Sequence, residues 1–171
     1  MLAQLLAPFE CEVSACDPFV SNEALNEHDI LRVDDLVSLA RQSDIFVVGI
    51  PPTPKTISII NTAVIDALPR GAIFILVTRA AVVEQVPLWK RVEANELKVA
   101  IDVYDPEPPP ADSPIRRYPN VIHTPHSAGR TGQAHRGCFL ATCKELASLL
   151  KADPLQYRVS RQQFEMYAGK L

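Results

Sequence analysis

The chain has 171 residues, and its 17 lysines and arginines stand against 20 acidic residues, which gives a formal net charge of −3. Hydrophobic residues make up 47% and charged residues 22%, a composition typical of a globular protein with a buried core rather than of a disordered one. The acidic balance argues against nonspecific nucleic-acid binding, which needs a basic surface. No apolar run reaches the roughly 18 residues that a membrane helix requires, and the N-terminal sequence lacks the features of a signal peptide.

The cysteines of the chain are Cys11, Cys16, Cys138 and Cys143, and no two of them form a CxxC pair. Tetrahedral zinc sites usually show tighter pairing, so no metal ligand is predicted. Because free cysteines are often buried, we expect buried or half-buried free thiols, with a metal site or a disulfide as the alternative. Free thiols favour a cytoplasmic location.

Segments with strand and helix patterns alternate along the chain. A continuous β-branched and aromatic run at 45–50 predicts a strand buried on both faces, as in a parallel sheet. Asn61 can cap a helix that begins after it. In chain order, the predicted elements are the end of a helix at 1–7, a strand at 10–16, a helix at 33–41, a strand at 45–50, a helix at 62–68, a strand at 72–77, a helix at 84–95, a strand at 97–103, a proline-rich loop at 105–119, a strand at 121–123 and a helix at 131–151.

The apolar strands and the crossovers of roughly ten to twenty residues between them are typical of an open parallel α/β sheet with helices on both faces. Leu88 and Trp89, early in the helix at 84–95, face either the core or a partner. The last helix carries apolar residues that can share one stripe, namely Phe139, Leu140, Cys143, Leu146, Ala147 and Leu150.

Polar side chains follow the predicted strands at the edge where such a sheet binds ligands. Arg79, Glu107 and His126 come after three different strands. An imidazole can donate the proton that a carbonyl takes up on reduction, a carboxylate can hold that imidazole in one tautomer, and a guanidinium can polarise the carbonyl. Each residue also has an alternative interpretation. Arg79 can form a surface ion pair, Glu107 can be a solvated loop residue, and His126 can cap a loop. Asp17 either binds an adenosine ribose or starts a turn with Pro18.

These segments resemble the nucleotide-binding domain of the D-isomer-specific 2-hydroxyacid dehydrogenases. The similarity covers roughly residues 8–158, and its last two motifs are highly specific. The matching segments are the strand ending in Asp17-Pro18, Ser43-Asp44-Ile45 followed by Pro51 to Thr56 (family SD…PLTPET), Thr78-Arg79 with Val82-Val83-Glu84 (the arginine motif), Asp102 to Pro108 (DVFxxEP) and Asn120 to Thr131 (NVxxTPHxAGxT).

The resemblance implies a Rossmann-like fold, NAD as cofactor, a 2-hydroxy or 2-oxo acid as substrate, and a homodimer formed through this domain. It implies that Arg79 binds and polarises the substrate, that Glu107 pairs with the histidine, and that His126 is the acid–base group. Asp17 favours NAD, because it would repel the 2′-phosphate of NADP. The residues implied to line the cofactor are Asp17, Ile50, Pro51, Thr56, Val77, Thr78, Arg79, Asp102, His126, Ala128 and Gly129.

The chain also departs from the family pattern. Leu76 and Ala80 replace the Asn and Gly of the family's NxxRG segment, changes that weaken cofactor or substrate contacts. No GxGxxG occurs, although the family places this phosphate-binding loop after its first strand. We therefore interpret residues 1–152 as a partial NAD(P)-binding Rossmann domain that lacks the first strand and the glycine loop, and 153–171 as a polar tail. The absent strand lies mid-sheet, so its neighbours would have unpaired edges.

Two functional hypotheses follow from the sequence. In the first, the chain is part of an NAD-dependent oxidoreductase that acts on the CH–OH group of 2-hydroxy acids, and the truncated chain is inactive by itself. In the second, it is a catalytically inactive remnant that keeps the fold and serves as a binding or partner module.

Overall fold

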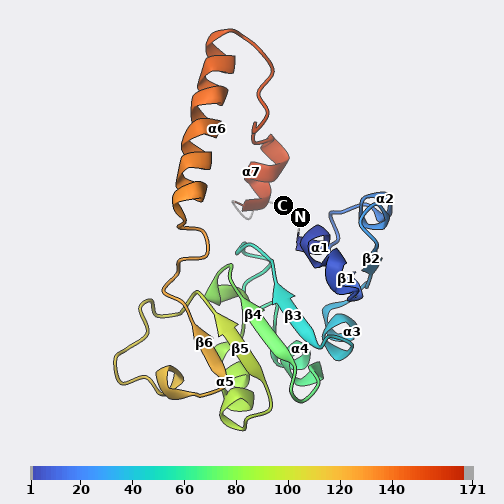
Figure 1. The fold of residues 1–171 in the computed structure, drawn as a ribbon, viewed down its shortest axis with the longest axis vertical. Coiled ribbons are helices and arrows are strands. Elements are labelled where there is room, and N and C mark those ends of the chain that lie inside the picture. Colours follow the sequence, from blue (N-terminus) through green and yellow to red (C-terminus); the bar gives the residue numbers. More distant parts are fainter. Residues whose placement is uncertain (1, 168–171) are drawn as a thin grey trace.

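The computed structural model describes residues 2–167, and its strands pair in parallel in two separate sheets (Figure 1). The smaller sheet pairs β1 (Val13–Ala15) with β2 (Ile30–Arg32). The larger sheet has the order β3-β4-β5-β6 and consists of β3 (Ile45–Val48), β4 (Ile73–Leu76), β5 (Lys98–Ile101) and β6 (Val121–His123). Parallel strands joined by helical crossovers form the predicted α/β, Rossmann-like arrangement.

Most helices begin at a side-chain cap that the sequence supplies. The Asn61 side chain accepts a hydrogen bond from the backbone N–H of Val64 at 3.2 Å, as predicted, and Thr131 caps the longest helix in the same way. The helices are α1 (Leu2–Leu6), α2 (Asn22–Asn26), α3 (Leu36–Arg41), α4 (Thr62–Ala67), α5 (Gln85–Glu93), α6 (Gly132–Leu150) and α7 (Arg161–Tyr167), with 3-10 turns at Ala7–Phe9, Ala80–Val82 and Pro114–Arg117. Of these, α2 and α7, like strand β2, were not predicted.

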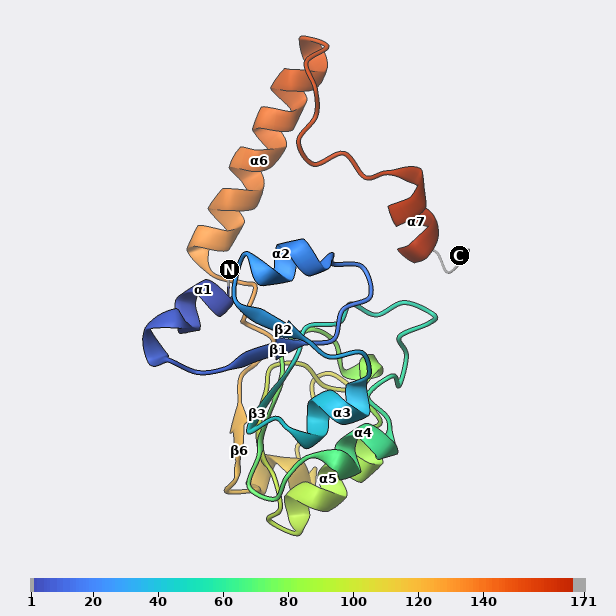
Figure 2. The ribbon, with the colours of Figure 1, turned by 90° about the vertical axis from the view of Figure 1, so that its right-hand side faces the viewer.

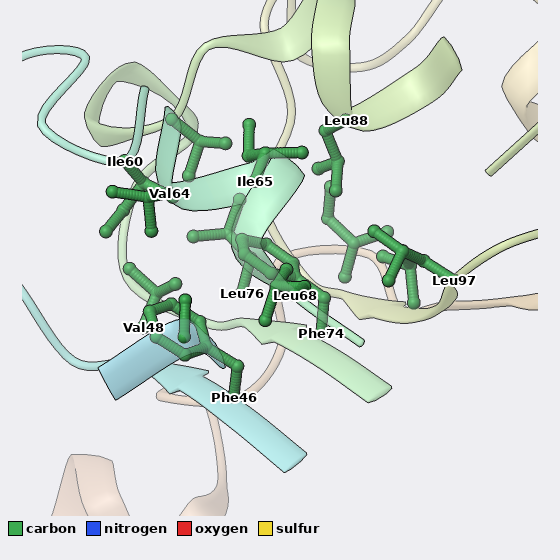
Figure 3. Close-up of a cluster of buried hydrophobic side chains, with 14 of the residues drawn as sticks. Phe46, Val48, Ile60, Val64, Ile65, Leu68, Phe74, Leu76, Leu88 and Leu97 are labelled. Atoms are coloured by element: carbon green, nitrogen blue, oxygen red, sulfur yellow. The ribbon is translucent and has the colours of Figure 1, made fainter. Parts of the chain in front are cut away.

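The core lies between the larger sheet and helices α3, α4 and α5 (Figure 3). Phe46 and Phe74 come from neighbouring strands, and their rings stack with centroids 5.9 Å apart. Ile65 of α4 and Leu88 of α5 cover them and have no exposed surface. Burial of side chains of this size contributes about 1.5–3 kcal/mol each, so this layer holds the sheet in place. Leu88 therefore faces the core, whereas Trp89 is half-buried and stacks on the ring of Tyr118.

The other face of the larger sheet is not covered by α3, α4 or α5, which lie together on one side (Figure 2). Ile45 and Val47 of β3 are 57% and 43% exposed, and Ile122 of β6 is 69% exposed. The predicted Rossmann-like α/β fold is confirmed, but the prediction that the strand at 45–50 is buried on both faces is wrong. That prediction came from the apolar composition of the strand, which does not show what packs on it.

The unpaired edges agree with the sequence prediction. Within the described residues, β1 pairs only with β2 and β3 pairs only with β4, so each has one edge free of a strand partner. Open edges expose backbone N–H and C=O groups that normally pair in a sheet interior.

Helix α6 extends away from the larger sheet (Figures 1 and 2), and none of its described residues is buried. The predicted stripe lies in the open, with Phe139 69% and Leu150 80% exposed. Cys138 and Cys143 on this helix are exposed, as is Cys11 after α1, so the prediction of buried thiols is wrong for these residues. Cys16 is half-buried as expected, and all of these cysteines are free thiols.

Candidate active site

The carboxyl ends of β5 and β6 bring a carboxylate and an imidazole together. Glu107 lies in the loop after β5 and His126 in the loop after β6, and the two strands are neighbours in the sheet. The Nδ1 atom of His126 lies 2.6 Å from Oε1 of Glu107. An ionised carboxylate only accepts hydrogen bonds, so Nδ1–H of the imidazole is the donor. The pair leaves Nε2 of His126 for another partner, and the side chains of His126 and Glu107 are 26% and 37% exposed.

Asp102 holds the loop that carries His126. Its Oδ1 accepts hydrogen bonds from the hydroxyl of Thr124 at 2.5 Å and from the backbone N–H of Ser127 at 2.8 Å, and its Oδ2 accepts one from the N–H of Ala128 at 2.9 Å. The residue is only 2% exposed. Burial by itself raises the pKa of Asp102, but these hydrogen bonds and the nearby His126 outweigh it, so the pKa of the carboxyl is lowered.

The backbone of His126 adopts a left-handed conformation, with φ of 52°. This region is uncommon for residues other than glycine and costs on the order of 1 kcal/mol. The hydrogen bonds of Asp102 flank this residue on both sides, at Thr124 and at Ser127. They offset that cost and direct the imidazole toward Glu107.

Thr78 and Arg79 follow β4 at the same edge of the sheet. The hydroxyl Oγ1 of Thr78 is buried and has no hydrogen-bond partner among the described residues. Arg79 is exposed, and its guanidinium donates to the carbonyl of Thr78 at 2.7 Å. Within the described part of the chain, Arg79 forms no ion pair with Glu107, so the structure joins two of the three predicted catalytic residues directly. Val77, just before them, is 43% exposed.

The substituted residues of the arginine motif are buried rather than exposed at this edge. Leu76 has no exposed surface and packs in the core, and Ala80 is 5% exposed. We expected Leu76 to weaken a cofactor or substrate contact, but its side chain lies in the protein interior.

The remaining predicted cofactor residues lie in turns after β1, β3 and β6. Asp17 follows β1 in the smaller sheet, and its Oδ1 accepts the N–H of Phe19 at 2.8 Å, which leaves Oδ2 for a ligand. After β3, the hydroxyl of Thr56 donates to the carbonyl of Pro51 at 2.7 Å. Ile50 is half-buried, whereas Pro51, Ala128 and Gly129 are exposed.

Sequence reasoning missed several residues that shape these loops. The Arg32 guanidinium donates to the carbonyls of Asp17 and Val20 and to the side chain of Asn22, and so holds the loop after β1. The hydroxyl of Tyr104 lies 3.1 Å from Nδ1 of His123. An arginine ten or more positions along the chain from its partners gives no local signal.

Within the described residues, no group of three or more His, Cys, Asp or Glu side chains gathers where it could hold a metal ion. Among the same residues, no helix combines the length and the apolar character needed to span a membrane.

Ligands bind at the carboxyl edge of an open parallel α/β sheet, which is where Glu107 and His126 meet. A family model for the NAD-binding domain of the D-isomer specific 2-hydroxyacid dehydrogenases matches residues 1–128. This chain therefore belongs to that family, whose domain binds NAD.

Curated relatives agree with this assignment. D-3-phosphoglycerate dehydrogenase of Archaeoglobus fulgidus is 29% identical over 165 residues, which cover 96% of this chain and 31% of the relative. The chloroplastic/mitochondrial formate dehydrogenase of Arabidopsis thaliana is 32% identical over 133 residues, which cover 77% of this chain and 35% of the relative. The chain thus spans about a third of the length of these relatives.

Solved structures show the same fold. The apo form of D-mandelate dehydrogenase from Rhodotorula graminis superposes with a TM-score of 0.82 at 22% identity, over 93% of this chain and 47% of that one. A D-isomer specific 2-hydroxyacid dehydrogenase from Xanthobacter autotrophicus Py2, in complex with NADPH and MES, gives a TM-score of 0.77 at 26% identity, over 94% of this chain and 66% of that one.

Proposed function

We propose that this chain forms the NAD-binding and proton-transferring part of an oxidoreductase that acts on the CH–OH group of 2-hydroxy acids. The observation that carries this proposal is the 2.6 Å hydrogen bond between Glu107 and His126 at the carboxyl edge of the sheet. An imidazole whose Nδ1 is held by a carboxylate presents Nε2 to a substrate oxygen in one tautomer.

In the proposed reaction, His126, Glu107 and Arg79 each have a separate role. When bound, NADH supplies the hydride that adds to the carbonyl carbon of a 2-oxo acid. His126 donates a proton from Nε2 to the carbonyl oxygen, so that a 2-hydroxy acid is formed, and takes it back in the reverse direction. Glu107 stabilises the protonated imidazole through Nδ1, and the Arg79 guanidinium pairs with the substrate carboxylate and polarises the carbonyl.

Several features of the described chain fit a nicotinamide dinucleotide. The buried Thr78 hydroxyl lacks a partner, which is the state expected of a group that hydrogen-bonds a ligand. The exposed Val77 beside it offers an apolar contact, and Ile50, Pro51, Thr56, Ala128 and Gly129 complete the proposed lining. Asp17 would bind the adenosine ribose and favour NAD over NADP. Asp102 is buried and accepts hydrogen bonds from Thr124, Ser127 and Ala128, so we assign it the part of holding His126 near the cofactor.

The test measures turnover in the natural polypeptide, including any sequence that precedes residue 1 in its gene. With NADH and a panel of 2-oxo acids, His126→Ala lowers kcat by about 10³-fold and Glu107→Gln lowers it by a smaller factor, because general acid–base catalysis contributes about 10²–10⁴-fold. His135→Asn, which changes an exposed histidine on α6, is the matched control and leaves kcat unchanged. Wild-type kcat in His126→Ala would remove the assignment.

A second candidate function, a binding or partner module without turnover, is favoured by the absence of a GxGxxG motif from the sequence. That motif binds the pyrophosphate at a helix N-terminus in dinucleotide-binding domains. Calorimetry with NADH separates the two candidates: micromolar binding by this chain supports the oxidoreductase, and no binding supports the module with an inactive chain. An in-frame GxGxxG upstream of residue 1 in the gene would likewise support the oxidoreductase.

We also propose that the protein is a cytoplasmic homodimer that associates through this domain. The free cysteines fit a reducing compartment. Leu146, Leu149 and Leu150 of α6 are 54%, 62% and 80% exposed, and clustered apolar side chains of this kind mark interaction surfaces. Sedimentation at high micromolar concentration measures the association, and a clean monomer would contradict it.

A further inference from the structure

The Glu107–His126 pair spans two loops, so its geometry depends on what holds those loops together. Glu107 belongs to the loop after β5 and His126 to the loop after β6. Asp102 supplies one cross-link, through Thr124, Ser127 and Ala128. An open groove of about 430 Å³ lies beside Glu107 and exposes both loops to water.

Tyr104 and His123 supply a second contact between the same loops, on the side of this groove. Tyr104 stands three positions before Glu107, and His123 is the last residue of β6. Their rings stack with centroids 6.0 Å apart and planes inclined by 19°. The Tyr104 hydroxyl lies 3.1 Å from Nδ1 of His123 and 3.2 Å from the carbonyl oxygen of Thr124, two positions before His126.

The hydrogen atoms available determine how these contacts are made. The Tyr104 hydroxyl has one proton, and the carbonyls of Thr124 and Ile101, 3.2 and 3.3 Å away, can only accept, so the hydroxyl donates between these two carbonyls. All of these contacts are compatible when His123 carries its proton on Nδ1 and donates it to the Tyr104 oxygen. Burial raises the pKa of Tyr104, and the charge of Asp102 adds to this effect, so the hydroxyl keeps its proton at neutral pH.

We propose that Tyr104 and His123 are positioning residues that clamp the His126 loop to the Glu107 loop and so set the geometry of the acid–base pair. The family motif DVFxxEP has phenylalanine where this chain has Tyr104, and a phenylalanine cannot make the bond to Thr124. The clamp therefore depends on the hydroxyl of Tyr104. Its part in catalysis rests on the proposed function above, whereas the clamp itself is a property of the loops.

The clamp is tested by NMR on the 171-residue chain. The signals are the Nδ1–H proton of His126 and the hydrogen exchange of the Ser127 and Ala128 amides. Tyr104→Phe keeps the ring but removes the hydroxyl, so we expect about fivefold faster exchange at both amides, the effect of one hydrogen bond, and a broadened Nδ1–H signal. Tyr118→Phe is the matched control, because the Tyr118 hydroxyl makes no hydrogen bond within the described residues, and it leaves these signals unchanged.

Substitutions of His123 separate hydrogen bonding from packing. His123→Leu removes the donor and reproduces the effect of Tyr104→Phe. His123→Asn places a side-chain N–H near the position of Nδ1 and restores at least half of the lost protection. The proposal is overturned if Tyr104→Phe behaves like Tyr118→Phe, or if His123→Asn protects no better than His123→Leu.

The failure of the clamp and the failure of the proposed function give different results. If the oxidoreductase assignment is wrong, turnover is absent while the NMR effects remain. If only the clamp is wrong, turnover depends on His126 while Tyr104→Phe leaves the NMR signals and kcat unchanged. With both correct, Tyr104→Phe lowers kcat severalfold and leaves KM for NADH unchanged, because the substitution disturbs the acid–base pair and not the cofactor surface.

Discussion

Replacing Asp102 with Asn tests whether the buried carboxylate holds the His126 loop. In the wild type, Oδ2 of Asp102 accepts a hydrogen bond from the backbone N–H of Ala128 at 2.9 Å. The substitution keeps the size of the side chain and its Oδ1 acceptor, but it replaces Oδ2 with an NH₂ group that cannot accept this bond. Hydrogen bonds to charged groups contribute about 1.5–3 kcal/mol each. One such bond is lost, and those from Thr124 and Ser127 lose the charge of their acceptor. We therefore expect the free energy that stabilises the His126 loop to fall by about 2–4 kcal/mol.

Two measurements report this loss of stability. Amide hydrogen exchange reports the loop directly, and 2 kcal/mol corresponds to about 30-fold faster exchange at Ser127 and Ala128. Urea denaturation reports the part of the loss that reaches the whole domain. Asp66→Asn is the matched control, because Asp66 is exposed on α4 and its carboxylate accepts no hydrogen bond within the described residues. Exchange within twofold of wild type in Asp102→Asn would refute the reasoning.

The same carboxylate makes the wild-type stability depend on pH. Because the pKa of Asp102 is lowered in the folded state, its contribution is present above the ordinary carboxyl pKa of about 4 and is lost as the pH falls through the lowered value. The free energy of unfolding should therefore fall more steeply below about pH 4 in wild type than in Asp102→Asn. Equal slopes in the two proteins would contradict the assignment.

Further predictions concern the core, a sheet connection and the thiols. Phe74→Ala should lower the free energy of unfolding by about 3–5 kcal/mol, because Phe74 has no exposed surface; urea denaturation measures this, and a loss below 1 kcal/mol would contradict it. Asn120→Ala removes donors to the carbonyls of Val92 at 2.9 Å and Leu97 at 2.7 Å, and a loss of about 2 kcal/mol is expected in the same assay. Cys16 should react with a thiol reagent more slowly than Cys11, because burial and nearby aspartates raise the pKa of Cys16; equal labelling rates at pH 8 would argue otherwise.

The meeting of Glu107 and His126 could be predicted from sequence because strand ends place residues without any knowledge of side-chain packing. A residue that follows a parallel strand lies at the carboxyl edge of the sheet, and this rule alone brought Glu107 and His126 to one edge. The helix cap at Asn61 was predicted for a similar reason, since it depends only on residues nearby in the chain.

The misses have physical causes as well. Strand β2 has only three residues in polar surroundings, which is too short for an alternating pattern to emerge. The exposure of Ile45 and Val47 depends on what packs against β3, and apolar composition does not record that. Tyr104 and His123 stand 19 positions apart and meet only because β5 and β6 pair.

The division of the strands into two sheets has a consequence for unfolding. No strand pairing joins the β1–β2 pair to β3 within the described residues, so the N-terminal segment lacks the ladder that makes a sheet melt as one unit. The β1–β2 segment is therefore expected to open first, at a denaturant concentration where the layer of α4, α5 and the larger sheet still protects its amides. A protease added under those conditions should cut before α3 and release a resistant fragment that retains both Glu107 and His126.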